Sequence, residues 1–281
     1  MKEQTVALYT KAMKHRDWYF TRLYPWHIRI NKHPFLTVWY ALADRFWSIV
    51  VRLNGNPLIS MTTFWNQKLQ APFPDYRSLL HHGLLDAREL PVEDFLIQNL
   101  TERDIFFDVG ANIGFYTALA QSLGATAYAF EPTPRTFAIL QRNVPNAVLV
   151  NKALLDKEGE ISFTDFGIEN AGSNMIAGKQ EGNITVQATT LDVYCKEHNV
   201  YPTCIKMDVE KAERYALAGA KEVLSKHPVL IIETGDKQVI EELLSQGYTA
   251  YHFDHARSGA ATRYNLGEET LSANMLFLPK Q

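Results

Sequence analysis

Three groups of residues have the types and spacing needed for chemistry, and the first is a glycine turn. It comprises Asp108-Val109-Gly110-Ala111-Asn112-Ile113-Gly114 and follows the apolar run from Ile105. Gly110 can adopt backbone conformations that are closed to other residues, and Gly114 lets a helix begin close to a sheet and to its ligand. A dinucleotide fingerprint would have a third glycine, in the order Gly-x-Gly-x-x-Gly. Asp108 would also repel a pyrophosphate, but it suits a cationic ligand.

The second group is Glu131, which stands 23 residues after Asp108 at the end of the run 125–130. A carboxylate at this place can accept hydrogen bonds from both hydroxyls of an adenosine ribose. Alone it is equally consistent with a helix cap, but paired with the glycine turn it predicts nucleoside binding. Together, Asp108 and Glu131 favour S-adenosylmethionine, whose sulfonium and amino group are positive.

The third group lies in the segment 205–213, where Asp208 and Glu210 follow a predicted strand. Methyl transfer to a hydroxyl requires the oxygen and the methyl group to be held in line and a proton to be removed. Either carboxylate could act as the base, or both could join Glu233 in holding a divalent cation such as Mg²⁺ that lowers the hydroxyl pKa. The alternative is that these acids cap a helix N-terminus.

The elements that must position these groups are short apolar runs that alternate with helical patterns. This alternation predicts an α/β fold with a parallel sheet and right-handed crossovers, which brings the carboxyl ends of the strands to one edge. Strands are expected at 105–109, 125–130, 147–151, 184–188, 203–207, 229–232, 249–253 and 274–278, and helices at 115–123, 134–143, 191–198, 211–225 and 236–246.

Composition limits the function further. The chain has 281 residues, 46% of them hydrophobic and 21% charged, which suits one α/β domain with an appendage. Its net charge is −3, but residues 1–60 carry nine Lys/Arg against three Asp/Glu, so the remainder is acidic and argues against nucleic acid. The two cysteines, Cys195 and Cys204, have no metal-type spacing and suggest a reducing compartment. The first 20 residues lack a signal-peptide pattern, which favours the cytoplasm.

The N-terminal part is compositionally separate, because all five tryptophans fall within the first 65 residues. Residues 35–53 are long enough to span a bilayer, but Asp44 and Arg45 in the middle argue against it. Two interpretations stay open, namely a helix packed on the main domain or on a dimer partner, and a peripheral helix at the inner membrane face. The turn at residues 54–57 predicts a hairpin near 49–72. We therefore expect a helical arm at 1–53, a hairpin and lead-in helix at 54–100, and a cofactor-binding domain at 101–281.

Six motifs occur in an order that resembles a known family. They are D-V-G-A-N-I-G at 108–114, A-F-E-P at 129–132, N-K-A-L at 151–154, A-G-S-N-M at 171–175, T-L-D at 190–192 and I-K-M-D-V-E at 205–210. Over residues 83–253 the chain resembles the FkbM-type S-adenosylmethionine-dependent methyltransferases. The resemblance implies a class I methyltransferase (Rossmann-like) fold, with a seven-stranded, mostly parallel sheet, helices on both faces and an antiparallel last strand. It also implies O-methylation, commonly of sugar hydroxyls or of natural-product scaffolds.

The resemblance also assigns roles to residues. Asp108, Gly110, Asn112 and Gly114 would cradle the methionine part of the cofactor, Glu131 would bind the ribose, and Asn151 and Ala153 would lie near the adenine. Lys206, Asp208 and Glu210 match the family's acidic motif and are the candidate catalytic residues, and Glu233 matches an acid after the next strand. One position departs from the pattern, since Lys211 stands where the family usually has glycine, and this would alter the acceptor pocket.

These inferences predict a methyltransferase of class EC 2.1.1 that acts on a sugar hydroxyl of a glycan or glycolipid. Two alternatives stay open, O-methylation of a small polyketide-like product and a non-catalytic nucleoside-binding module. A nicotinamide-dependent oxidoreductase is disfavoured by the missing third glycine. The metal requirement and the formation of a homo-oligomer are left open.

Overall fold

The computed structural model describes residues 2–11, 42, 45–46, 49–50, 53, 58–73, 76, 79–80, 83–85, 89–165, 175–176, 182–209, 211–253, 261–265 and 273–280. Most of the predicted arm helix at 35–53 therefore lies outside the described residues, as does Glu210. The chain divides into two compact units, Met1–Asp86 and Ala87–Gln281. The described helices include none that is long and apolar enough to cross a membrane.

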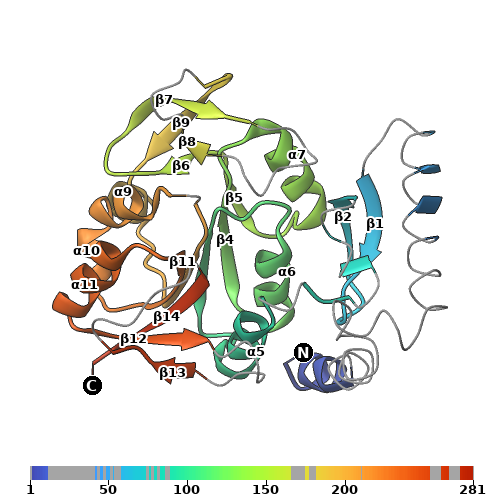
Figure 1. Ribbon diagram of the computed structural model, residues 1–281, viewed down its shortest axis with the longest axis horizontal. Coiled ribbons are helices and arrows are strands. Elements are labelled where there is room, and N and C mark those ends of the chain that lie inside the picture. The colour runs from blue at the N-terminus through green and yellow to red at the C-terminus, as the bar shows by residue number, and fades with distance from the viewer. Residues whose placement is uncertain are drawn as a thin grey trace, which may run out of the picture. The chain divides into compact units, whose positions relative to one another are not determined.

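The first unit contains a helix over residues 2–11 and a hairpin of β1 (Leu58–Thr62) and β2 (Lys68–Pro72) (Figure 1). A hairpin is present within the predicted range, and the predicted turn at residues 54–57 lies outside the described residues. The chain reverses at residues 63–67, where the Thr63 N–H donates to the Gln67 carbonyl at 2.9 Å. Asn66 supplies the left-handed residue with φ +68°, a conformation that asparagine tolerates well.

The second unit is built on a twisted sheet with the strand order β13-β12-β14-β11-β10-β3-β4-β5. Its strands are β3 (Ile105–Val109), β4 (Thr126–Phe130), β5 (Val148–Val150), β10 (Cys204–Met207), β11 (Val229–Thr234), β12 (Tyr248–Phe253), β13 (Ala261–Arg263) and β14 (Ala273–Pro279). The last strand, β14, is antiparallel to both of its neighbours, as the resemblance implies. The described sheet has eight strands rather than seven, because the short β13 pairs with the edge strand β12.

Helices cover both faces of this sheet (Figure 1). They are α5 (Leu90–Asn99), α6 (Phe115–Ser122), α7 (Pro134–Asn143), α8 (Leu191–His198), α9 (Glu213–Ala218), α10 (Lys221–Leu224) and α11 (Lys237–Ser245). Helices α8 to α11 pack their apolar sides on alternate strand residues such as Phe107, Ile205 and Ile232. The intervening residues, among them Asp108 and Lys206, face the side on which α6 lies. The sheet thus has one apolar face and one face that carries buried polar groups.

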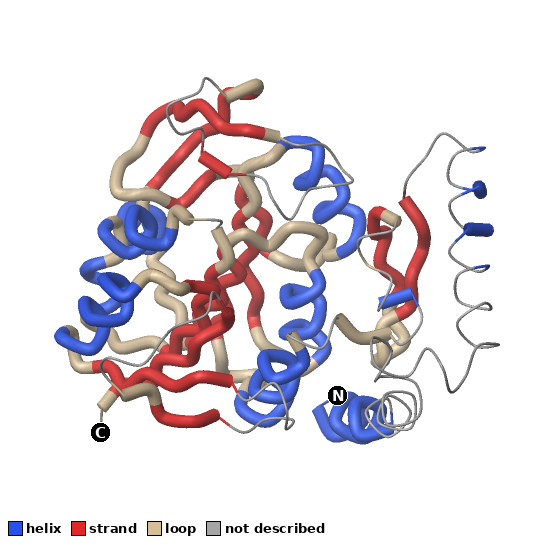
Figure 2. The backbone as a smooth tube through the Cα atoms, in the orientation of Figure 1, coloured by secondary structure: helices blue, strands red, loops and turns tan. Residues whose placement is uncertain are grey.

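A second, smaller sheet lies beside the first (Figure 2). It has the order β6-β9-β7-β8 and consists of β6 (Ala153–Leu154), β7 (Gly159–Thr164), β8 (Met175–Ile176) and β9 (Ile184–Thr189). The predicted strand at 184–188 is confirmed as β9, but it lies in this small sheet and not in the main one. Thr185 and Gln187 are exposed while Val186 and Ala188 are buried, an alternation that suits a sheet with one solvent-exposed face. The small core of this sheet packs against Val209 and Ala212, on either side of Lys211.

Candidate functional site

The candidate site lies where the order of the main sheet reverses. Strands β3 and β10 are neighbours, with Asp108 opposite Lys206, but the chain continues from β3 to one side of the sheet and from β10 to the other. The Asp208 N–H donates to the Val109 carbonyl at 2.9 Å, so the two strand ends stay joined beyond the sheet. Open α/β sheets bind ligands at the carboxyl edge of such a switch point.

The glycines of the first motif serve the packing of the chain itself. Gly110 has φ +80°, and a Cβ there would lie 1.8 Å from the Asp208 carbonyl oxygen. Gly114 has φ +88°, and its Cβ would lie 2.6 Å from Leu140 of α7. Gly114 therefore allows the start of α6 to approach α7. Both positions require glycine whether or not a ligand is bound.

Asn112 lies in the same turn, in the left-handed region with φ +50°. Its N–H donates to Glu131 Oε2 at 3.1 Å. Its side-chain oxygen, Oδ1, is buried and has no hydrogen-bond partner among the described atoms. A buried acceptor without a donor is costly, and a ligand amino group would supply the donor.

Glu131 follows β4 and is only 6% exposed. Each carboxyl oxygen accepts one backbone hydrogen bond, from Asn112 and from Thr133 at 2.9 Å. Burial raises the pKa of Glu131 to about 7, and these hydrogen bonds oppose the shift. Since each carboxylate oxygen has two lone pairs, Glu131 can still accept ribose hydroxyls.

The two residues expected near the adenine, Asn151 and Ala153, lie in different environments. The Asn151 side chain donates to the backbone carbonyls of Glu131 at 2.8 Å and of Pro132 at 3.0 Å, so it holds the turn that carries Glu131. Ala153 is 7% exposed and packs in the core of the small sheet. Its methyl group contacts protein on nearly all sides.

Asp108 is 2% exposed and accepts a hydrogen bond from the Thr117 hydroxyl of α6 at 2.6 Å. Burial raises the pKa of Asp108 to about 6, against the opposing effects of Thr117 and of the positive Lys206. A cation bound at this edge would favour the ionised carboxylate. The set formed by Asp108, Asn112 and Glu131 therefore fits a nucleoside with a positive amino acid tail.

Lys206 is 1% exposed, and its ammonium lies 3.0 Å from Asp208 Oδ2 and 5.4 Å from the centre of the Tyr116 ring. Burial lowers the pKa of Lys206, but the charges of Asp208, Glu89 and Glu233 outweigh it, so the pKa is raised. Lys206 is thus a buried cation that holds Asp208. The Asp208 side chain itself is 37% exposed at the edge of the sheet.

A buried network that the sequence did not reveal supports this pair. Glu89, just before α5, accepts hydrogen bonds from the Tyr116 hydroxyl at 2.7 Å and from the Asn274 side chain at 3.1 Å. Glu89 and Asn274 are 185 positions apart. The only signal in the sequence was a single asparagine in the otherwise apolar strand of residues 274–278.

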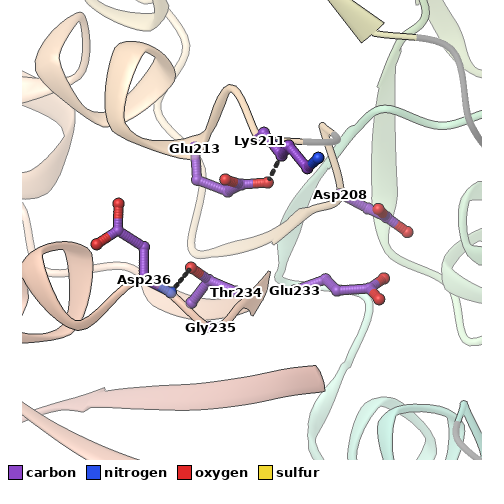
Figure 3. Close-up of a pocket in the computed structure, with 7 residues that line it drawn as sticks. All are labelled: Asp208, Lys211, Glu213, Glu233, Thr234, Gly235 and Asp236. Carbon is purple, nitrogen blue, oxygen red and sulfur yellow. Dashed lines mark hydrogen bonds between the residues drawn. The ribbon is translucent and has the colours of Figure 1, made fainter. Parts of the chain in front are cut away.

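A pocket of about 220 Å³ opens beside Asp208 (Figure 3). It is lined by Asp208, Lys211, Glu213, Glu233, Thr234, Gly235 and Asp236. Lys211 has φ +69°, which explains why glycine suits this position in the family pattern. Its backbone N–H donates to Glu213 at 3.0 Å, so the acidic side chain secures the unusual turn.

The described residues of this pocket do not form a divalent-metal site. Among the described residues, no group of three His, Cys, Asp or Glu side chains is arranged to hold a metal ion. The Lys206 ammonium already lies against Asp208, and burial together with the Asp208 charge raises the pKa of Glu233 to about 7. Of the three predicted metal ligands, Asp208 and Glu233 share the pocket, while Glu210 lies outside the described residues.

Comparison with known proteins identifies the family. The family model described as the methyltransferase FkbM domain matches residues 108–253. This range contains the glycine turn, Glu131 and the segment 205–213. The hexuronic acid methyltransferase AglP of Haloferax volcanii is 31% identical over 166 residues, covering 56% of this chain and 68% of that protein. The 2-O-methyltransferase NoeI of Sinorhizobium fredii is 28% identical over 159 residues, covering 49% of this chain and 65% of that protein.

Among solved structures, an rRNA methylase from Streptococcus thermophilus has a TM-score of 0.40 and 14% identity, with 70% of this chain and 98% of that chain covered. The two sequence relatives are matched over about two thirds of their own length. The family match itself spans more than half of the chain and includes the glycine turn, Glu131 and the Lys206–Asp208 pair. The chain belongs to the FkbM methyltransferase domain family.

Proposed function

We propose that this protein transfers a methyl group from S-adenosylmethionine to a hydroxyl of a sugar in a glycan or glycolipid. Family membership supports the methyl transfer. One relative is named for hexuronic acid and the other for 2-O-methylation, which supports a sugar acceptor and an oxygen nucleophile. The observation that carries the proposal is Asp208, a carboxylate fixed by a buried lysine at the same sheet edge as Asp108 and Glu131.

The cofactor would lie along the ends of β3 and β4. Glu131 would accept the ribose hydroxyls, because its carboxylate is already oriented by two backbone N–H groups. The buried Oδ1 of Asn112 would accept from the amino group of the methionine part. The Asp108 carboxylate would offset the positive charge of the cofactor. The Asn151 side chain would hold the turn that carries Glu131.

When bound, the cofactor supplies a methyl group on a positive sulfur that leaves as a neutral thioether. The chain must hold the acceptor oxygen in line with that methyl group and receive the hydroxyl proton. Asp208 has one oxygen bonded to Lys206, which leaves the other oxygen to accept the hydroxyl hydrogen bond. Lys206 is too deeply buried to touch the acceptor, so it acts as a positioning residue through Asp208.

The lining of the pocket favours a sugar over an apolar polyketide. Four of its seven lining residues carry carboxyl groups, and Thr234 adds a hydroxyl. Carboxylate oxygens accept the many hydroxyl donors of a sugar, whereas an apolar scaffold would leave them desolvated and unpaired.

The proposal is tested by incubating the purified chain with S-adenosylmethionine and either p-nitrophenyl β-D-glucuronide or p-nitrophenyl β-D-glucoside. Mass spectrometry detects the methylated product, and mild base separates a stable ether from a labile ester. We expect an ether that Asp208→Asn abolishes and that the exposed control Asp156→Asn retains. An ester product, or transfer to a polyketide alcohol but to neither glycoside, would refute the sugar hydroxyl.

A further inference from the structure

We propose that Glu233 takes the proton from the acceptor hydroxyl, while Asp208 orients that hydroxyl. This inference rests on the proposed function and divides its chemistry between two neighbouring carboxyl groups. It assigns Glu233 a role in proton transfer in place of the metal ligation that the sequence suggested.

The two carboxyl groups are neighbours at the edge of the sheet. Strands β10 and β11 are parallel, and Met207 pairs with Ile232, so Asp208 and Glu233 each follow the last pair by one residue. Both side chains line the pocket, and Figure 3 shows their carboxyl groups pointing to the same side. Glu233 is half-buried, so it is open to a bound acceptor and yet partly shielded from water.

Asp208 is poorly suited to receive a proton. Its Oδ2 accepts from the Lys206 ammonium at 3.0 Å, and that ammonium is almost completely buried. Protonation of Asp208 would leave a buried cation without its nearest counter-charge, which is strongly unfavourable. The ion pair with Lys206 instead fixes the position of the Asp208 carboxyl group, as a residue that orients a hydroxyl requires.

Glu233 has the opposite environment. Burial and the negative charges of Asp208 and Glu89 raise the pKa of Glu233 to about 7, although Lys206 opposes the shift. The other charged groups on its pocket are Lys211, Glu213 and Asp236. A general base works best when its pKa lies near the working pH, because it is then both ionised and basic enough.

The neighbouring strand β14 carries a hydrogen-bond acceptor for the protonated form of Glu233. Glu233 lies directly opposite Asn274 of β14, on the same face of the sheet. Asn274 is 3% exposed; its amide nitrogen donates to Glu89, and its Oδ1 has no hydrogen-bond partner among the described atoms. A protonated Glu233 would donate to this acceptor in addition to Asp208, with which it already shares a hydrogen bond. On this reading Glu89 and Asn274 are positioning residues for the base.

The hydroxyl oxygen forms the new bond to the methyl carbon as the bond between that carbon and sulfur breaks, and its electrons remain on sulfur. The hydroxyl proton passes to the Glu233 carboxylate. It then leaves to water through the pocket opening, which returns Glu233 to its ionised form.

The first test is a pH profile of kcat/KM between about pH 5 and 9 with the two glycosides, for wild type, Glu233→Gln, Asp208→Asn and the exposed control Glu241→Gln. We expect wild-type activity to fall below about pH 7, and Glu233→Gln to lower kcat at least ~100-fold and remove this limb. Asp208→Asn should be inactive at every pH, because the acceptor hydroxyl is no longer oriented. Glu241→Gln should match wild type. Retention of the limb in Glu233→Gln would overturn the assignment.

The second test does not depend on turnover. The ¹³C carboxyl resonance of Glu233, assigned by its loss in Glu233→Gln, should titrate near pH 7 and move to lower pH in Asp208→Asn. Titration at the ordinary glutamate value would overturn the inference. Failure of wild type to methylate either glycoside, with this titration intact, would instead count against the acceptor in the proposed function.

Discussion

Replacing Lys211 by glycine should stabilise the protein, although it removes a side chain from the pocket. Lys211 has φ +69°, and the left-handed conformation costs an L-residue about 1–2 kcal/mol. Glycine avoids that cost but loses more backbone conformational entropy on folding, which lowers the free energy of unfolding by about 0.5–1 kcal/mol. The backbone N–H that donates to Glu213 is kept. The expected net gain in the free energy of unfolding is therefore about 0.5–1 kcal/mol.

The assay is thermal and urea unfolding of wild type, Lys211→Gly and Lys211→Ala. For a unit of this size, a gain of that magnitude raises Tm by about 1–4 °C. Lys211→Ala removes the same ammonium but retains the backbone strain, so it should show no such gain. Equal stabilities of the two variants, or a lower Tm for Lys211→Gly, would refute the argument that backbone strain explains the glycine of the family pattern.

Three further changes have expected outcomes. Asp108→Asn should raise the free energy of unfolding at pH 8 by about 1–2 kcal/mol. The pKa of Asp108 is about 6 in the folded state against an ordinary 3.8, so the ionised carboxylate makes the folded protein less stable as the pH rises between these two values. Urea unfolding at pH 5 and 8 would contradict this if the gain did not grow with pH. Gly110→Ala should cost more than ~3 kcal/mol, because its Cβ would meet the Asp208 carbonyl, whereas Gly159→Ala, with φ +130° and nothing within 4 Å, should cost only the backbone strain; equal costs by urea unfolding would remove the packing argument. Asp208→Asn should abolish methyl transfer while cofactor affinity by calorimetry stays within about threefold, and unchanged turnover would remove Asp208 from the mechanism.

The sequence was sufficient to predict the elements that local patterns determine. The strand, turn and helix from Ile105 to Leu123 follow from an apolar run, two glycines and a helical stripe, and the structure has β3 and α6 there. Glu131 was found because a fixed spacing from the glycine turn places it at the end of the next strand. Both depend on interactions between residues that are close in sequence.

Features that depend on distant contacts could not be predicted in the same way. The run 184–188 has the composition of a strand, but only its pairing with β7 and β6 assigns it to the small sheet. Glu89, Tyr116 and Asn274 meet because α5, α6 and β14 pack together, and no local pattern marks them. The departure at Lys211 was visible in the sequence, while its cause, a positive φ, required the structure.

The edge of the sheet formed by β3, β4 and β10 is expected to bind S-adenosylmethionine. Calorimetric titration of the purified chain with S-adenosylmethionine and, separately, with NAD measures this binding. We predict binding of S-adenosylmethionine alone, with an affinity that falls at least ~10-fold in Glu131→Ala because the ribose hydroxyls lose their acceptor. Binding of NAD alone, or of neither compound, would contradict the account.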